Sequence, residues 1–206
     1  AETLDRTLRI WGDALYGFDI SNDFVSATKL RLALLARQRG CFLEPIGDLD
    51  TIFPNILCVN ALEVRKLFKE VNLILLNPPY QGISAPDSCA WAKGKASSAA
   101  IFVDHIIRHM GNGTRLLSIL PEVLRCGSRY QKFRNEAGRY VQSTNVKSLG
   151  TFDSWTDIDV FISDLKLNET LAAKDRVPVF QISQPKTSVV GDRFNVHVGP
   201  LVEYRS

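Results

Sequence analysis

Apolar positions recur with two different periods in the first 120 residues, and the two periods alternate along the chain. Apolar residues at helical spacing predict amphipathic helices, whereas short continuous apolar runs predict strands that are buried on both faces. Helices are therefore expected at 3–13, 23–39, 62–69 and 99–109, and strands at 14–20, 56–59, 71–76 and 114–120. Strands that alternate with helices predict an α/β fold with a mostly parallel sheet and right-handed crossovers.

The segment 23–39 has the strongest helical pattern of the chain, and Gly40 is suited to end it. Its large apolar residues fall mainly on one side of the predicted helix, which we expect to face the core. These residues are Phe24, Ala27, Leu30, Leu34 and Leu35.

The pattern becomes less regular after residue 80. The segment 81–98 is rich in Gly, Ser, Ala and Pro, and we interpret it as a mobile loop. A further helical stretch is expected within 122–139. Strands are expected at 146–152 and 160–165, antiparallel to each other, and strand-like segments follow at 177–182 and 194–198.

Composition places the chain among ordinary globular proteins. Its 206 residues are 45% hydrophobic and 23% charged, which argues against a disordered chain, a collagen or a coiled coil. No apolar run is long enough for a membrane span, and the N-terminal residues lack the pattern of a signal peptide. The net charge of +3 permits a nucleic-acid partner without indicating one.

The cysteines do not have the spacing of a zinc site or of a disulfide framework. We interpret them as reduced thiols of a cytoplasmic protein. They are Cys41, Cys58, Cys89 and Cys126.

The most specific feature is Asn77-Pro78-Pro79-Tyr80, directly after the predicted strand 71–76. The two prolines fix the backbone and remove two donors, so the nearby carbonyl stays available to an outside group. The Asn77 side chain offers a second carbonyl acceptor, and Tyr80 offers a ring for stacking. Two acceptors can hold both hydrogens of one amino group and aim its lone pair at an electrophile. Asp19 ends another predicted strand, and ligands of parallel sheets bind at such ends.

The run L-L-N-P-P-Y resembles motif IV of the S-adenosylmethionine-dependent amino-methyltransferases, in particular the N6-adenine DNA methyltransferases of restriction–modification systems. Y-G-F-D-I resembles the strand whose terminal acid binds the cofactor ribose, which implies that Asp19 has this role and that Ile20 lies beside the adenine. I-L-C-V-N-A-L resembles the motif that receives the adenine amine. Asn60, followed by Ala61, stands where the family usually has an acid.

The resemblance extends over roughly residues 14–200. F-V-D-H-I-I-R-H-M-G-N-G-T-R-L-L-S-I-L-P resembles the helix, turn and strand after the catalytic loop. S-L-G-T-F-D-S-W-T-D-I-D-V-F-I-S-D-L resembles the late motif whose aromatic ring packs on the flipped adenine. Trp155 is the first candidate for that ring and Phe152 the second. Asn77 and the Pro78 carbonyl would orient the amine, and Tyr80 would stack on the opposite face of the base.

The resemblance also implies what this stretch lacks. Family members begin with a strand and a glycine-rich turn that holds the cofactor, and no such turn precedes Ala14. We therefore expect a Rossmann-like methyltransferase fold without its first strand, with a catalytic domain at 1–185 and a connection toward a target-recognition region at 186–206. The expected partners are double-stranded DNA and a missing N-terminal segment or a specificity or restriction component. This chain alone is expected to be inactive.

Simpler explanations exist for each candidate residue. Asn77 can start a turn, Asp19 can cap a helix, Asn60 can be a loop asparagine and Trp155 can be a core residue. His105 and His109 are four residues apart, but a helix face explains them better than a metal site, and no metal is expected. Basic residues around the loop form either a solvated face or phosphate contacts. They are Lys93, Lys95, Arg125, Arg129, Lys132, Arg134 and Arg139.

Two other functions stay open. The same tetrapeptide serves any planar amino group, so methylation of a protein glutamine at N5 or of an RNA base is an alternative to the DNA reaction. A non-catalytic fragment is the other alternative.

Overall fold

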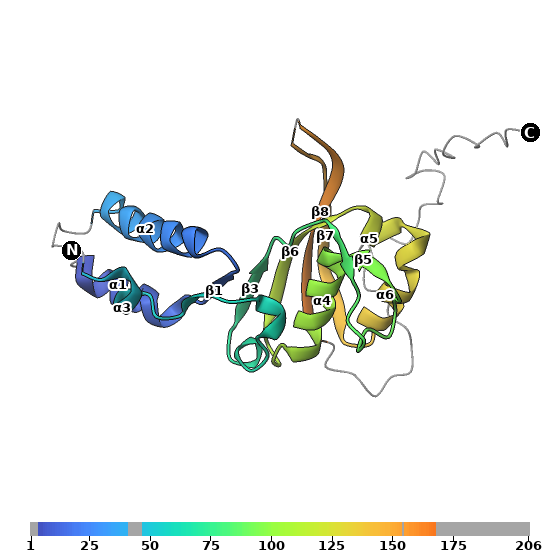
Figure 1. Cartoon of the computed structure of the whole chain (residues 1–206), viewed down its shortest axis with the longest axis horizontal. Helices are drawn as coiled ribbons and strands as arrows, with labels where there is room; N and C mark the ends of the chain where they lie inside the picture. Colours follow the sequence, from blue (N-terminus) through green and yellow to red (C-terminus); the bar gives the residue numbers. More distant parts are fainter. Residues whose placement is uncertain (1–3, 41–46, 154, 168–206) are drawn as a thin grey trace, which may run out of the picture. The chain divides into compact units, whose positions relative to one another are not determined.

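A computed structural model of the chain describes residues 4–40, 47–153 and 155–167, which fold as two compact units (Figure 1). The first unit contains the described residues of 1–72 together with 101–114. The second contains 73–100 and the described residues from 115 onward. The strands expected at 177–182 and 194–198, and the domain boundary expected at 185, lie outside the described residues.

The first unit is built on two short parallel strands. β1 (Gly17–Asp19) pairs with β2 (Ile56–Cys58), with Phe18 opposite Leu57. Three helices complete its core: α1 (Leu4–Ala14), α2 (Asn22–Gln38) and α3 (Leu49–Ile52). The buried apolar side chains are Leu4, Leu8, Val25, Ala33, Ala36, Phe53 and Ile56. The helix expected at 62–69 is instead two 3-10 turns, η1 (Ala61–Glu63) and η2 (Leu67–Lys69).

The buried face of α2 differs from the expected one. Val25, Ala33 and Ala36 are buried, whereas Phe24 is 65% exposed and Leu30 is 48% exposed. The prediction was wrong because large side chains were taken to mark the core face. Small side chains on the other face allow close packing of the helix, and this close packing determines which face is buried.

Gly12 in α1 lies against the backbone of α3. A Cβ atom at this position would clash with the Ile52 carbonyl oxygen. We expect Gly12→Ala to destabilise the first unit by about 1–3 kcal/mol, although alanine is the better helix former, because backbone atoms cannot move aside cheaply. Chemical denaturation measures this, with Gly47→Ala as the control. At Gly47 the nearest atom would be 4.0 Å away, so equal losses in the two variants would contradict the packing argument.

The second unit contains a four-stranded sheet in the order β3-β6-β8-β7. β3 (Leu73–Leu76) and β6 (Arg115–Pro121) are parallel, whereas β8 (Thr156–Leu167) is antiparallel to both β6 and β7 (Val141–Asp153). The expected late antiparallel hairpin is therefore confirmed. Leu116, Leu120, Phe161 and Leu165 alternate on one buried face of β6 and β8.

The segment expected to be a mobile loop forms a hairpin. β4 (Gly82–Ser84) pairs antiparallel with β5 (Lys95–Ser97), and Ser98 N–H donates to the Gln81 carbonyl at 2.8 Å. The prediction was wrong because the small residues of this segment give little periodic signal, while its order comes from backbone hydrogen bonds. α4 (Ser98–His109) follows directly.

The helix expected within 122–139 is interrupted. α5 (Val123–Cys126), the 3-10 turn η3 (Ser128–Tyr130) and α6 (Gln131–Ala137) replace it. The interruption falls at Gly127, whose backbone is extended. A side chain there would meet the Val123 carbonyl oxygen at 2.5 Å.

β1 and β3 each have an open edge among the described residues. β1 pairs with β2 alone, and β3 is the outermost strand of its sheet. Leu75 of β3 is 73% exposed and Leu73 is 48% exposed, an unusual solvent exposure for an apolar strand. That a further strand covers these edges stays a prediction. No described helix is both long and apolar enough to cross a membrane.

Candidate functional site

The second unit holds Asn77-Pro78-Pro79-Tyr80 at the carboxyl end of β3. Asn77 and Pro79 are exposed and Pro78 is buried, so the tetrapeptide is anchored while the amide of Asn77 meets solvent. The Tyr80 hydroxyl lies 3.3 Å from Asn77 Oδ1 and 3.3 Å from the Ile119 carbonyl oxygen of β6. The single hydroxyl proton can be donated to either acceptor. Tyr80 therefore links the Asn77 amide to the neighbouring parallel strand.

Burial raises the pKa of the Tyr80 hydroxyl above its usual value. The hydroxyl is protonated at neutral pH and can act as a donor toward Asn77 Oδ1. This contact orients the amide with its oxygen held near the ring, and the second lone pair of the oxygen can still accept from a ligand amino group.

The β7–β8 hairpin brings one of the two aromatic candidates to Tyr80. The ring of Phe152 lies edge-on to the ring of Tyr80, with centroids 5.9 Å apart and planes at 81°. Trp155 lies in the turn of the hairpin, which extends past the end of β6 (Figure 1), and is 93% exposed. The role of either ring toward a base stays a prediction. The geometry favours Phe152, which the sequence ranks second.

The first unit places the other predicted site residues at the carboxyl ends of its two parallel strands. Asp19 ends β1 opposite Cys58 of β2, and the Cys58 thiol donates to the Ile20 carbonyl at 3.5 Å. The Ser21 N–H donates to Asp19 Oδ1 at 2.8 Å, which fixes the carboxylate at the strand end. Ile20 is 79% exposed beside it. A fixed acceptor next to an open apolar side chain suits a ligand that combines hydroxyl groups with a flat ring.

Asn60 and Ala61 follow the carboxyl end of β2. Asn60 caps η1, because its Oδ1 accepts from the Leu62 N–H at 3.1 Å, and its Nδ2 donates to Glu63 at 3.4 Å. The capping role is therefore observed, and the cofactor role stays a prediction. A carbonyl oxygen that accepts one N–H keeps a lone pair for another donor.

An open hollow of about 580 Å³ lies beside Asn60 in the first unit. Its lining includes Tyr16 and Phe18 in and just before β1, Leu57 and Val59 in and just after β2, and Arg65 from the segment after η1. The sequence analysis did not name these residues. The signal that could have found them is the alternation of Tyr16 with Phe18 and of Leu57 with Val59, which puts four apolar side chains on one face of the strand pair.

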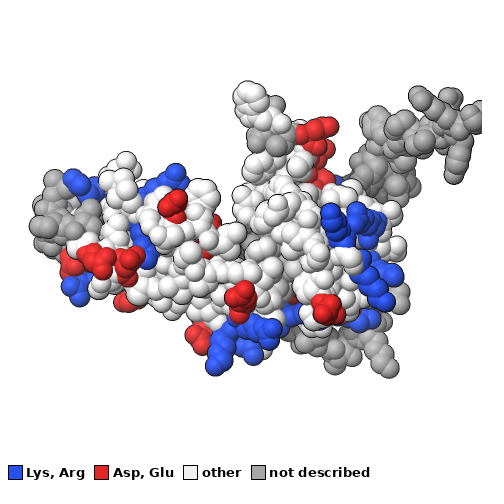
Figure 2. All heavy atoms as spheres, in the orientation of Figure 1, with Lys and Arg blue, Asp and Glu red and all other residues white. Residues whose placement is uncertain are grey.

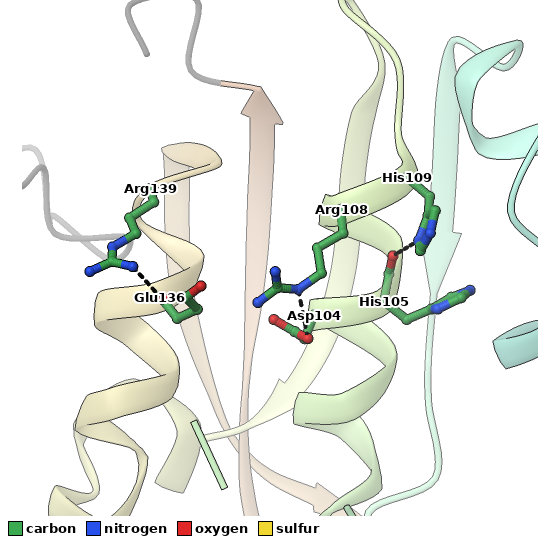
Figure 3. A network of polar contacts seen from close by, with 6 residues as sticks. All are labelled: Asp104, His105, Arg108, His109, Glu136 and Arg139. Carbon is green, nitrogen blue, oxygen red and sulfur yellow. Dashed lines mark hydrogen bonds and ion pairs between the residues drawn. The ribbon is translucent and has the colours of Figure 1, made fainter. Parts of the chain in front are cut away.

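The two histidines of α4 lie one turn apart on the helix (Figure 3), and His105 links α4 to the segment that contains Val64 and Phe68. His105 Nε2 lies 2.7 Å from the Val64 carbonyl, its ring packs edge-on against Phe68, and His109 Nδ1 donates to the His105 carbonyl at 2.7 Å. Arg108 pairs with Asp104 on the same helix. No cluster of potential metal ligands occurs within the described ranges.

Burial lowers the pKa of the His105 imidazole. The unfolded chain therefore takes up a proton at higher pH than the folded chain does, so stability falls as pH drops through about 6.5. We expect His105→Gln, whose amide can still donate to Val64, to flatten the decline in unfolding free energy between about pH 7.5 and about pH 5.5. Denaturation at several pH values measures it. Equal slopes for the wild type and the variant would contradict this role for His105.

The parallel pairs β1–β2 and β3–β6, with helices between the strands along the chain and a late antiparallel hairpin, are typical of a Rossmann-like α/β fold. No protein-family model matches the chain, and no curated protein matches its sequence. Solved structures support the fold. The chain is similar to the M protein of the type I restriction enzyme EcoKI, with a TM-score of 0.50 and 14% identity over 81% of this chain and 33% of that one.

A second similar structure is a protein from Listeria monocytogenes whose description assigns it to the class I S-adenosylmethionine-dependent methyltransferases. The TM-score is 0.48 and the identity 16%, over 75% of this chain and 45% of that one. The chain thus spans less than half the length of either structure. At 14% identity the likeness to the EcoKI M protein shows the fold and not the reaction.

Proposed function

We propose that the chain carries catalytic residues of an N6-adenine DNA methyltransferase that uses S-adenosylmethionine. The observation that carries the proposal is the anchored Asn77 amide, held by the Tyr80 hydroxyl at the carboxyl end of parallel strand β3. This is the end at which parallel sheets bind their ligands. An acceptor fixed beside an aromatic ring is suited to a planar base that bears an amino group.

The residues of the first unit fit the adenosyl part of the cofactor. The Asp19 carboxylate, fixed by Ser21 N–H, can accept from vicinal ribose hydroxyls, and the exposed Ile20 side chain can cover one face of an adenine. Asn60 Oδ1 keeps a lone pair for an exocyclic amine, and Ala61 next to it leaves room for the ring. The bound cofactor would supply a methyl group on a positively charged sulfur.

At the amine, Asn77 Oδ1 and the Pro78 carbonyl would each accept one N–H hydrogen bond from N6. With both hydrogens held, the nitrogen lone pair would point away from the two acceptors. The bound cofactor would supply the methyl group from its sulfonium, which would leave as a neutral thioether, and the methylated nitrogen would release a proton to solvent. Because the amine is acidified only after attack, no strong base is needed, and positioning is the main contribution of the protein.

A base in duplex DNA has to leave the stack before its N6 can reach such acceptors. Unstacking and unpairing cost a few kcal/mol, and enzymes that extrude their target base offset this cost by stacking the base in the pocket. In this chain Tyr80 would provide one stacking face. Phe152, edge-on to Tyr80 at 5.9 Å, would close the pocket on a second side.

The partners follow from the same proposal. The EcoKI M protein is described as part of a type I restriction enzyme, and another similar structure is described as a type I restriction–modification assembly. We propose that this protein also works beside a specificity or restriction component, and that a further polypeptide segment pairs with the open edges of β1 and β3.

Radioactive methyl transfer separates the proposal from its alternatives. The full-length product of the reading frame that encodes these residues is incubated with labelled S-adenosylmethionine and, in separate reactions, duplex DNA, RNA or a glutamine-containing protein. Label in DNA supports the proposal. Label in protein or RNA alone, with none in DNA, assigns the chain to the other amino-methyltransferases, and no label in any acceptor supports a non-catalytic role.

A further inference from the structure

The basic residues of the β4–β5 hairpin and of the segment 122–139 divide into two groups by what their side chains contact. Three arginines are engaged within the unit. Arg125 pairs with Glu122, Arg139 pairs with Glu136 (Figure 3), and Arg134 donates to two backbone carbonyls of the Leu124–Gly127 segment. Arg125 and Arg139 are paired with carboxylates and Arg134 is half-buried, so these three contribute little to binding an outside partner.

The other group consists of four exposed cations, which we call the basic cluster: Lys93, Lys95, Arg129 and Lys132. Arg129 Nη2 donates to the Lys95 carbonyl at 2.8 Å, which joins β5 to η3. Lys93 is two residues from Lys95, and Lys132 is three residues from Arg129, on the first turn of α6. Figure 2 shows Lys and Arg side chains gathered over the region of α5 and α6. Asp87, in the loop of the β4–β5 hairpin, is an exposed carboxylate of the same segment.

The backbone beneath the basic cluster is held rigidly. The Ser97 N–H donates to the Tyr130 hydroxyl at 3.1 Å, so β5 is tied to η3 a second time. The buried ring of Trp91 packs on Tyr130 and Phe133, with centroids 6.4 Å and 5.1 Å apart. The positions of the cations are therefore set by the fold, although their side chains reach into solvent.

The β4–β5 hairpin connects the basic cluster to Tyr80. β4 starts two residues after Tyr80, and Gln81 is bonded to Ser98 while Ala85 is bonded to Gly94. Four residues therefore separate the tetrapeptide from the cluster, and even fully extended they would span only about 13 Å at about 3.3 Å per residue. Along one strand of duplex DNA this distance corresponds to about four nucleotides, because phosphates repeat every ~3.4 Å of helix axis.

We propose that the basic cluster binds the phosphate backbone of duplex DNA within about four nucleotides of the adenine that enters the Tyr80 site. Exposed cations that form no ion pair with a carboxylate of the described residues, on a base fixed by hydrogen bonds, suit a repeating polyanion, whose counterions they release. The distance to the adenine rests on the proposed function. The binding of duplex DNA by these four cations rests on their exposure and contacts alone.

The test measures the affinity of the full-length protein for a mixed-sequence duplex by fluorescence anisotropy at several salt concentrations. The variant carries Lys93→Gln, Lys95→Gln and Lys132→Gln, and keeps Arg129 because its guanidinium holds the Lys95 carbonyl. The matched control removes three exposed cations of the first unit, with Arg31→Gln, Arg37→Gln and Lys69→Gln. Both triple variants lower the net charge by the same amount.

Each lost phosphate contact lowers the slope of log affinity against log salt by about 0.9. The cluster variant lacks three such contacts, so its slope should be lower by about 2.7. Raising the salt from about 50 to about 200 mM should therefore weaken DNA binding by the wild type about 40-fold more than DNA binding by the cluster variant. The control should lose as much affinity as the wild type. A cluster variant with the salt slope of the wild type would overturn the inference, and so would a wild type that does not bind duplex DNA. The tests separate the two proposals: cluster-dependent DNA binding without methyl transfer to DNA would support the inference and contradict the proposed function.

Discussion

Replacing Asn77 by alanine should reduce methyl transfer by on the order of 10²-fold or more, because misplacement of a reacting group by about an ångström has an effect of this size. The variant removes one of the two acceptors that would hold the target amine. It also removes the acceptor toward which Tyr80 points its hydroxyl. Rates at saturating DNA and cofactor measure the effect on the chemical step rather than on binding.

The control for Asn77→Ala is Asn135→Ala, which removes an exposed amide from α6. Because Asn77 is itself exposed, neither substitution should change the unfolding free energy by more than a few tenths of a kcal/mol, about the usual effect of a surface change. A variant that lacks the Asn77 amide and yet keeps the wild-type rate would remove the basis of the proposed chemistry.

Removing the ring of Tyr80 should have the second largest effect. Tyr80→Ala is expected to weaken binding of the extruded base by about 5- to 150-fold, since stacking on one aromatic ring contributes about 1–3 kcal/mol. Tyr80→Phe keeps the ring and loses only the hydroxyl contacts, so a smaller loss of about 2- to 10-fold is expected. The fluorescence of 2-aminopurine at the target position reports extrusion directly. Equal losses in the two variants would show that the hydroxyl matters and the ring does not.

The same assay separates the two late aromatic residues. Phe152→Ala should reduce extrusion more than Trp155→Ala, because Phe152 contacts Tyr80 and Trp155 is 93% exposed in the hairpin turn. A larger loss in the Trp155 variant would restore the ranking that the sequence indicates. It would also mean that the hairpin turn approaches the base when DNA binds.

The sequence was sufficient to predict the features that depend on local pattern. The short apolar run before Asn77 predicted a strand with its site at the carboxyl end, and β3 ends at Leu76. The late segments predicted an antiparallel pair, which β7 and β8 confirm with more residues than expected. A short apolar run bounded by turn residues such as Asn77-Pro78-Pro79 is typical of a strand, because a helix is usually longer.

Features that depend on contacts between distant segments were not predictable. The buried face of α2 is chosen by close packing around Ala33 and Ala36, and Leu30 looks equally suitable in the sequence. The β4–β5 hairpin has no apolar period, and its order comes from backbone pairing such as Gly82 with Ser97. The approach of Phe152 to Tyr80 joins residues 72 positions apart, and helical or strand periodicity does not report such a contact.

The central claim is that the Asn77 site transfers a methyl group to N6 of adenine in DNA. Its most direct test is mass spectrometry of nucleosides from duplex DNA that has been incubated with S-adenosylmethionine and the full-length protein. We expect N6-methyldeoxyadenosine, formed by the wild type and reduced by on the order of 10²-fold with Asn77→Ala. Methylation of cytosine alone, or N6-methyldeoxyadenosine formed equally by the wild type and the Asn77 variant, would contradict the account.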